Sequence, residues 1–170
     1  MTESSTLQEL GAHLSALTES VAARAVTMEE GEWRRPYAPG KWTRAEVLGH
    51  LLDSAAHNHQ RFARALHAES LTAAGYDSAG QVRVQRYGHA PISLLTNSWT
   101  AQNRLLSYVL AQIPAAKEET PCLVGSAPPM TLRELAFDYV AHLEHHLRQI
   151  FGDEPIGYSS LVWPPAGRWQ

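Results

Sequence analysis

The sequence predicts an all-α protein that folds as a four-helix bundle in one domain, residues 1–170. Three observations predict this fold. Apolar residues recur three, four or seven positions apart through four long segments, as on the buried face of a helix. Stretches with glycine and proline separate these segments. No segment alternates strongly enough to predict a paired strand, so the helices have only one another to pack against.

The first helix is expected over residues 6–30. Its apolar residues follow helical spacing: Leu7, Leu10, Leu14, Leu17, Val21 and Met28. A stretch with four helix-breaking residues ends it: Gly31, Pro36, Pro39 and Gly40. Three aromatic residues near this break are expected to cover one end of the core: Trp33, Tyr37 and Trp42.

Two capping boxes mark the starts of the second and fourth helices. In Thr43-Arg44-Ala45-Glu46 the threonine side-chain oxygen accepts a hydrogen bond from a free backbone amide of the first turn. The glutamate side chain reaches back to the backbone amide of the threonine. The second helix is expected to continue to about His67. Thr131-Leu132-Arg133-Glu134 repeats the pattern and opens the fourth helix, which Gly152 ends.

The third helix is expected to begin at Pro91, a residue suited to a first helical turn, and to end before Pro114. Residues 70–90 are expected to form a long loop with room for a short helix. Long loops in compact domains often serve as lids or binding segments. Residues 114–130 form a second loop, and the tail 153–170 is expected to pack as an extended strap.

Composition excludes several classes of partner. The formal net charge is −3 and the isoelectric point is about 6.3, which gives no electrostatic basis for binding nucleic acid or a membrane surface. No apolar run reaches the roughly 18 residues of a membrane span, and no secretion signal is apparent at the start. Cys122 is the only cysteine and has no partner for an internal disulfide. A cytoplasmic protein is therefore expected.

Histidine is the unusual residue of this chain, with nine copies against fourteen lysines and arginines. Residues four apart on a helix lie about 40° apart around its axis, so His142 and His146 point from one face and can share one metal ion. Glu144 faces away, unlike the glutamate of the His-Glu-x-x-His zinc peptidases. His145 lies on the other side of His142 and is expected to be partly exposed.

A third ligand is expected from the second helix, where His50, Asp53 and His57 share a polar stripe. His57 lies about 10 Å further along the axis than His50, so one ion takes only one of them, and we select His50. Three protein ligands leave an open position for water or substrate, as in catalytic zinc sites. Asp53, one turn from His50, is the candidate catalytic residue; it can accept the second ring N–H of a ligating histidine and fix its tautomer.

A purely structural role for these histidines stays open. A single histidine in a bundle is more often packed and hydrogen-bonded than a ligand, whereas a pair four residues apart on a core stripe needs partners. The other histidines are expected at the surface: His13, His59, His67 and His89. Cys122 has no histidine adjacent in sequence and is expected to be an ordinary thiol. No glycine-rich phosphate loop occurs.

Two segments resemble signatures of the DinB/YfiT-like superfamily. Residues 41–54, followed by Arg61 and Phe62, resemble its second helix, and residues 142–150 resemble its last helix. The resemblance implies a four-helix bundle with long crossover connections, often dimeric. It also implies a divalent metal held by His50, His142 and His146, with zinc, nickel, iron and manganese all open.

The resemblance implies an activity only broadly, because the family includes metal-dependent hydrolases and transferases of low-molecular-weight thiols. We expect a metalloenzyme acting on a small molecule, in which the ion supplies most of the activation. Asp53 is a weak candidate base, and capping already explains Glu46. Two other hypotheses remain: a non-catalytic metal or small-molecule binder, such as a stress-associated one, and a helical interaction module whose histidines only pack.

Overall fold

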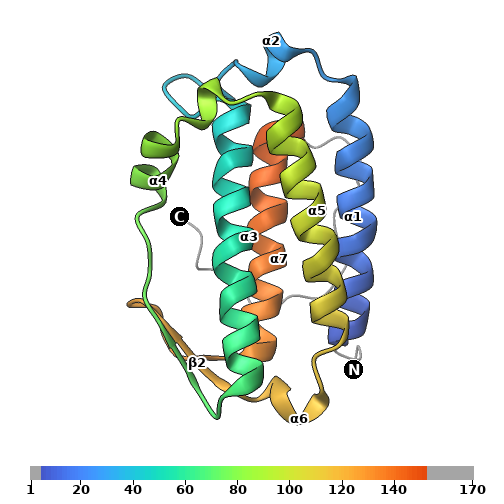
Figure 1. Ribbon diagram of the computed structural model, residues 1–170, viewed down its shortest axis with the longest axis vertical. Helices are drawn as coiled ribbons and strands as arrows, with labels where there is room; N and C mark the ends of the chain where they lie inside the picture. The colour runs from blue at the N-terminus through green and yellow to red at the C-terminus, as the bar shows by residue number, and fades with distance from the viewer. Residues whose placement is uncertain (1–4, 153–170) are drawn as a thin grey trace.

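The computed structural model describes residues 5–152, and four long helices dominate it (Figure 1). They are α1 (Leu7–Thr27), α3 (Arg44–His67), α5 (Ile92–Ala111) and α7 (Leu132–Phe151). The four lie side by side along the long axis of the molecule, and the predicted four-helix bundle is confirmed. The predicted strap over residues 153–170 lies outside the described residues.

The helix boundaries follow the capping residues. The Thr43 hydroxyl accepts a hydrogen bond from the Glu46 amide at 3.2 Å, and the Glu46 carboxylate accepts one from the Thr43 amide at 2.8 Å. Thr131 caps α7 in the same way. Thr6 forms a third capping box at the start of α1 with Glu9, which has the same Thr-x-x-Glu spacing.

The ends of the helices differ little from those predicted. The first helix ends at Thr27, and a separate short helix, α2 (Glu30–Trp33), follows it. Gly152 ends α7 with a φ of +72°, a conformation that glycine adopts without steric cost.

The core lies between the four long helices, where α1 packs mainly on α5, and α3 contacts both α5 and α7. Each of the four helices contributes leucines that are at most 1% exposed, among them Leu10, Leu14, Leu48, Leu51, Leu106, Leu110, Leu143 and Leu147. Burying each such side chain contributes roughly 1.5–3 kcal/mol, so these contacts make the bundle a firm support for side chains between α3 and α7. Within the part of the chain that the structure describes, no helix has the length and apolar character needed to cross a bilayer.

A small sheet closes one end of the bundle, and the sequence did not predict it. Its strands are β1 (Leu71–Ala73), β2 (Pro121–Val124) and β3 (Met130–Thr131), in the order β1-β2-β3. β1 pairs with β2 in parallel, and β2 pairs with β3 antiparallel. The two parallel strands come from connections far apart in the chain, so no local pattern marks their pairing.

The predicted loop 70–90 contains more regular structure than expected. β1 is followed by α4 (Ser78–Gln85) and the short 3₁₀ helix η1 (Tyr87–His89), with Arg86 in the left-handed conformation between them, at a φ of +54°. The second connection carries a four-residue helix, α6 (Ala115–Glu118), before the sheet.

Glu144 faces away from the paired histidines, as predicted, but it is buried rather than solvated. It accepts a hydrogen bond of 2.6 Å from Nε2 of His13 on α1. The prediction that His13 lies free at the surface is therefore wrong: the ring is half-buried and links α1 to α7. His67 and His89 are exposed, whereas His59 is half-buried.

Candidate metal centre

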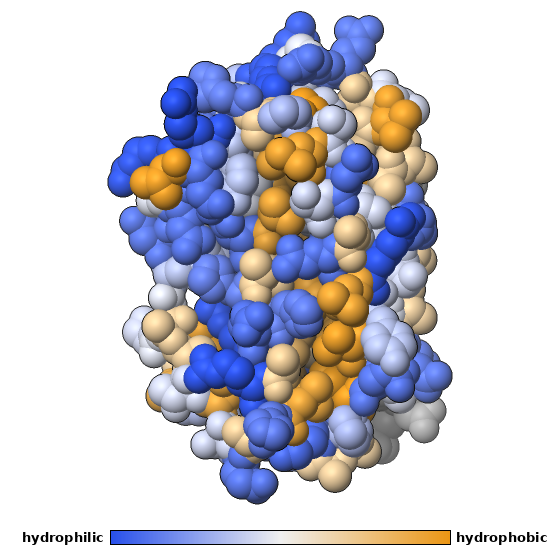
Figure 2. All heavy atoms as spheres, viewed as in Figure 1, coloured by the Kyte–Doolittle hydropathy of each residue, from blue (hydrophilic) through white to orange (hydrophobic). Residues whose placement is uncertain are grey.

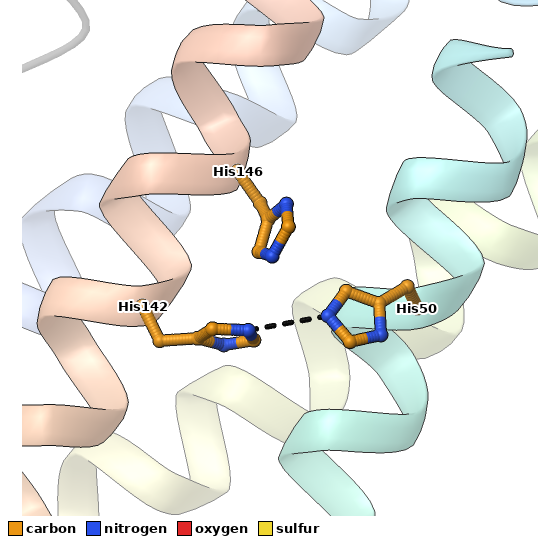
Figure 3. Close-up of side chains that lie close together, drawn as sticks. All are labelled: His50, His142 and His146. Atoms are coloured by element: carbon orange, nitrogen blue, oxygen red, sulfur yellow. Dashed lines mark hydrogen bonds between the residues drawn. The ribbon is translucent and has the colours of Figure 1, made fainter. Parts of the chain in front are cut away.

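The antiparallel arrangement of α3 and α7 creates the candidate site. The chain runs down α3 and returns up α7, so the first turns of α3 lie beside the last turns of α7 (Figure 1). A hydrogen bond of 2.9 Å from Arg44 Nε to the carbonyl of Ile150 joins these two ends. His50 on α3 is thereby placed opposite His142 and His146 on α7 (Figure 3).

The three imidazole rings converge on one point. One ring nitrogen from each histidine lies within 4.8 Å of the corresponding nitrogen of the other two. Nε2 of His50 and Nε2 of His142 are 3.2 Å apart, the contact drawn in Figure 3. The ring of His146 stands edge-on to both others, with centroids 4.6 Å from His50 and 4.5 Å from His142.

These distances fit a divalent metal. A tetrahedral ion with nitrogen ligands at about 2.05 Å separates those nitrogens by about 3.3 Å. The observed 3.2 Å between the two Nε2 atoms matches this value, and the ligand nitrogen of His146 lies within 4.8 Å of both. Imidazole suits zinc, nickel and iron, and does not choose among them. Among the described residues, no cysteine, aspartate, glutamate or fourth histidine joins the group.

The environment keeps all three rings neutral, the form that offers a lone pair to a metal. Burial, reinforced by the neighbouring His146, lowers the pKa of His50 to about 4. Burial lowers the pKa of His142 well below its ordinary value, and the other histidines add to this. Burial also lowers the pKa of His146, with His145 acting in the same direction and the hydrogen bond that His146 donates to Gln149 opposing it.

These shifts predict that the metal-free protein loses stability in acid. The folded-state pKa values lie below the ordinary histidine value of about 6.5, so the unfolded chain takes up protons first as the pH falls. The contribution of the three neutral rings to stability is complete above about pH 6.5 and is lost as the pH falls below it, for His50 toward a pH of about 4. Urea unfolding of chelator-treated protein at a series of pH values measures it.

Two substitutions make that measurement specific. His50→Asn removes a ring with a lowered pKa and is expected to flatten the pH profile. His67→Gln removes an exposed histidine and leaves the profile unchanged. An equal effect of both substitutions would contradict the assignment.

Neighbouring side chains orient the rings. Nδ1 of His146 donates to the amide oxygen of Gln149 at 2.8 Å, which leaves Nε2 with a lone pair for a metal. Nδ1 of His142 lies 3.4 Å from the Ser54 hydroxyl, and the ring of Trp42 packs on His50 with centroids 5.4 Å apart. Gln149 follows His146 by one helical turn in the sequence. The sequence pattern alone does not identify it as a hydrogen-bond partner of that histidine.

Asp53 lies close to the centre on α3 but bonds elsewhere. Its Oδ1 accepts hydrogen bonds from the Tyr87 hydroxyl at 2.6 Å and from Gln85 Nε2 at 2.8 Å. Its Oδ2 and the Nδ1 of His50 are both buried and have no hydrogen-bond partner within the described part of the chain. The bonds from Tyr87 and Gln85 attach η1 and the end of α4 to α3.

The alternative ligand His57 is used in another way. Its ring stacks on Tyr76, with centroids 4.0 Å apart and planes 14° apart, and its Nε2 lies 3.4 Å from the side-chain oxygen of Gln81. It does not belong to the convergent group, so the geometry agrees with the choice of His50. His145 is exposed, as predicted, and its Nε2 lies 3.3 Å from Gln149 Nε2.

Comparison with known proteins yields one family and one fold. The model of the DinB superfamily matches residues 5–150. YfiT from Bacillus subtilis, described as a probable metal-dependent hydrolase with an unusual four-helix bundle topology, is similar in structure: the TM-score is 0.76, with 23% sequence identity and 94% of each chain covered. At this identity the likeness concerns the fold. A comparison with curated proteins found no match.

Proposed function

This chain belongs to the DinB superfamily, and from that premise we propose that it is a metal-dependent hydrolase of a small molecule. The ligands of the divalent metal are His50, His142 and His146. The observation that carries this proposal is the convergence of three neutral imidazoles, with no further ligand in the group from residues 5–152. Three protein ligands leave a position for water or substrate, whereas structural zinc sites have four.

The protein's own residues prepare the site. A metal held by three histidines lowers the pKa of a bound water and polarises a carbonyl oxygen. The chain supplies three neutral nitrogens, and Gln149 holds the His146 tautomer by accepting its Nδ1–H. The packing of Trp42 on His50 keeps that ring in place. Since the rings come from two packed helices, little rearrangement is needed when the ion binds.

Thiol transfer is the second candidate, and the position of Cys122 bears on it. This residue is 1% exposed, and burial raises the pKa of its thiol. It is therefore a poor source of a reactive thiolate. A transferase reaction at this centre takes its thiol from a low-molecular-weight cosubstrate. Activity toward electrophiles only in the presence of such a thiol separates this candidate from the hydrolase.

Asp53 is proposed as the residue that assists the reaction, as the sequence suggested. Its buried Oδ2 is the atom available for a further hydrogen bond. The carboxylate also anchors Tyr87 and Gln85, so Asp53→Asn tests both roles. Loss of turnover with unchanged unfolding free energy supports assistance in the reaction; equal loss of both indicates an anchor alone.

The proposal is tested first by metal content. Protein purified without a histidine tag is expected to contain about one zinc, nickel, iron or manganese ion per chain. Zinc added to chelator-treated protein is expected to raise the melting temperature, because an ion at a hundred times its dissociation constant stabilises the fold by about 2.7 kcal/mol. Absence of both effects would leave three packed histidines and no metal centre.

A homodimer is proposed to form through α5. Three large side chains on this helix are 48–65% exposed: Leu94, Leu105 and Tyr108. Figure 2 shows apolar residues following α5 across this face of the molecule. Light scattering during size exclusion is expected to give twice the 18.8 kDa chain mass, and Leu105→Glu is expected to give one chain mass. A monomeric wild-type protein would exclude this interface.

A further inference from the structure

The groove between α3 and α7 widens into a cavity on the side of His142 away from His146. Its volume is about 170 Å³, similar to cavities of about 150 Å³ that hold a benzene-sized molecule. Ser54 and Arg61 line it from α3, and Asp138 and His142 line it from α7. His142 thus belongs both to the histidine group and to the cavity wall.

The three-stranded sheet, which the sequence did not predict, and the segment after β1 cover this cavity. Four covering residues come from outside the long helices: Tyr76 after β1, Val124 at the end of β2, Ala127 between β2 and β3, and Met130 in β3. Tyr76 is held in place by its stacking on His57. The cavity therefore has a polar floor on two helices and a largely apolar cover.

Arg61 is the cation of this cavity, and its hydrogen-bonding capacity is mostly unused. Its Nη1 reaches Asn58 Oδ1 and its Nη2 reaches the carbonyl of Ala74, both at 3.4 Å, close to the limit for a hydrogen bond. A guanidinium has five N–H donors, and Arg61 takes part in none of the ion pairs found among the described residues.

Burial affects the guanidinium as well. Removal from water lowers the pKa of Arg61, while Tyr76 and Asp138 act in the opposite direction. Arginine remains protonated under all ordinary conditions, so a partly buried charge is kept in the wall of this cavity. Such a charge is stabilised most by a carboxylate that accepts two parallel N–H bonds.

We propose that the cavity is the substrate subsite and that Arg61 binds a carboxylate of the substrate. This inference rests on the proposed function, because the reacting group of the same molecule lies at the three histidines. Arg61 is seven residues beyond Ser54, about 10 Å along the helix axis, and its side chain spans part of that distance. The substrate is therefore a short molecule with a carboxylate a few bonds from the group that reacts.

The other polar groups set the orientation. The Ser54 hydroxyl lies 3.4 Å from Nδ1 of His142, between the histidines and Arg61. Asp138 stands on the α7 side and repels an anion, which places the carboxylate on the α3 side with Arg61. A substrate bound in this orientation directs its other end toward the histidines.

Two hydroxamic acids of matched shape test the inference. Succinic acid monohydroxamate has a carboxylate where butyrohydroxamic acid has a methyl group, and a hydroxamate binds zinc at an open position. Zinc-loaded wild-type protein is expected to bind the carboxylate probe at least about tenfold more tightly in calorimetry, as one charge-assisted pair provides. Arg61→Gln is expected to abolish this preference without changing affinity for butyrohydroxamic acid or zinc.

Arg64→Gln is the matched control. It removes the same charge one turn further along α3, where the exposed Arg64 donates to the carbonyl of Thr72 outside the cavity. The preference is expected to survive in this variant. Equal binding of the two hydroxamates by the wild type, or a preference that survives in Arg61→Gln, would overturn the assignment of Arg61.

The test distinguishes failure of the proposed metal centre from failure of the assignment of Arg61. A protein that takes up no zinc refutes the proposed function, and the metal-free protein then decides on Arg61. Succinate is expected to raise its melting temperature more than neutral succinamide does, and Arg61→Gln is expected to remove the difference. No difference in the wild type would overturn the inference independently of the metal.

Discussion

His142→Ala is expected to weaken zinc binding by more than about 100-fold, because even loss of a residue that only orients a ligand costs 10–100-fold. His142 supplies the nitrogen 3.2 Å from Nε2 of His50, so its loss leaves two of the three proposed ligands. Competition with a chromogenic chelator measures the change.

His57→Ala is the control for this experiment. His57 lies on the same stripe of α3 as His50, but its ring stacks on Tyr76 outside the convergent group. Zinc affinity is expected to stay within about threefold, well below the effect of losing a ligand. Comparable losses in both variants would show that the ion is bound elsewhere along the stripe.

Gly49→Ala is expected to destabilise the protein by about 3 kcal/mol, at the upper end of the cost of overpacking. A Cβ at this position would lie 2.1 Å from Cδ2 and 2.6 Å from Cβ of Tyr87, so the side chain and η1 must move together. The movement breaks the 2.6 Å hydrogen bond from Tyr87 to Asp53. Urea unfolding monitored by circular dichroism gives the free energy.

Gly31→Ala provides the comparison. Gly31 lies in helix α2, and an added Cβ there would have no neighbour within 4 Å. Alanine is the better helix former, so this change is expected to leave stability unchanged or to raise it by up to about 1 kcal/mol. If Gly49→Ala were equally harmless, the close packing of Tyr87 on α3 would be wrong.

The long helices could be predicted because their signals are local. Apolar spacing and the two Thr-x-x-Glu boxes lie within single segments, and the same is true of the pair formed by His142 and His146. Predicting His50 as the third ligand required more than a local pattern. Its choice over His57 depended on axial distance and on the resemblance to the DinB family. The structure places His50 in the group and His57 on Tyr76.

The features that could not be predicted depend on segments distant in sequence. Leu71 pairs with Cys122 in the parallel strands, and neither strand has a pattern that identifies the other. His13 meets Glu144 across 131 positions, so the sequence alone predicted His13 at the surface. Arg61 appeared only as part of a family signature, because its cavity exists only after the sheet has formed.

The parallel pairing of β1 with β2 fastens the two long crossovers of the chain to each other over the mouth of the groove. The imidazoles stand on rigid helices, whereas the cover over the neighbouring cavity comes from short strands and turns. Insertions or substitutions in the β2–β3 hairpin therefore reshape what fits beside the imidazoles and leave the imidazoles where they are. Reactivity and selectivity reside in different segments, and related proteins can change the second while retaining the first.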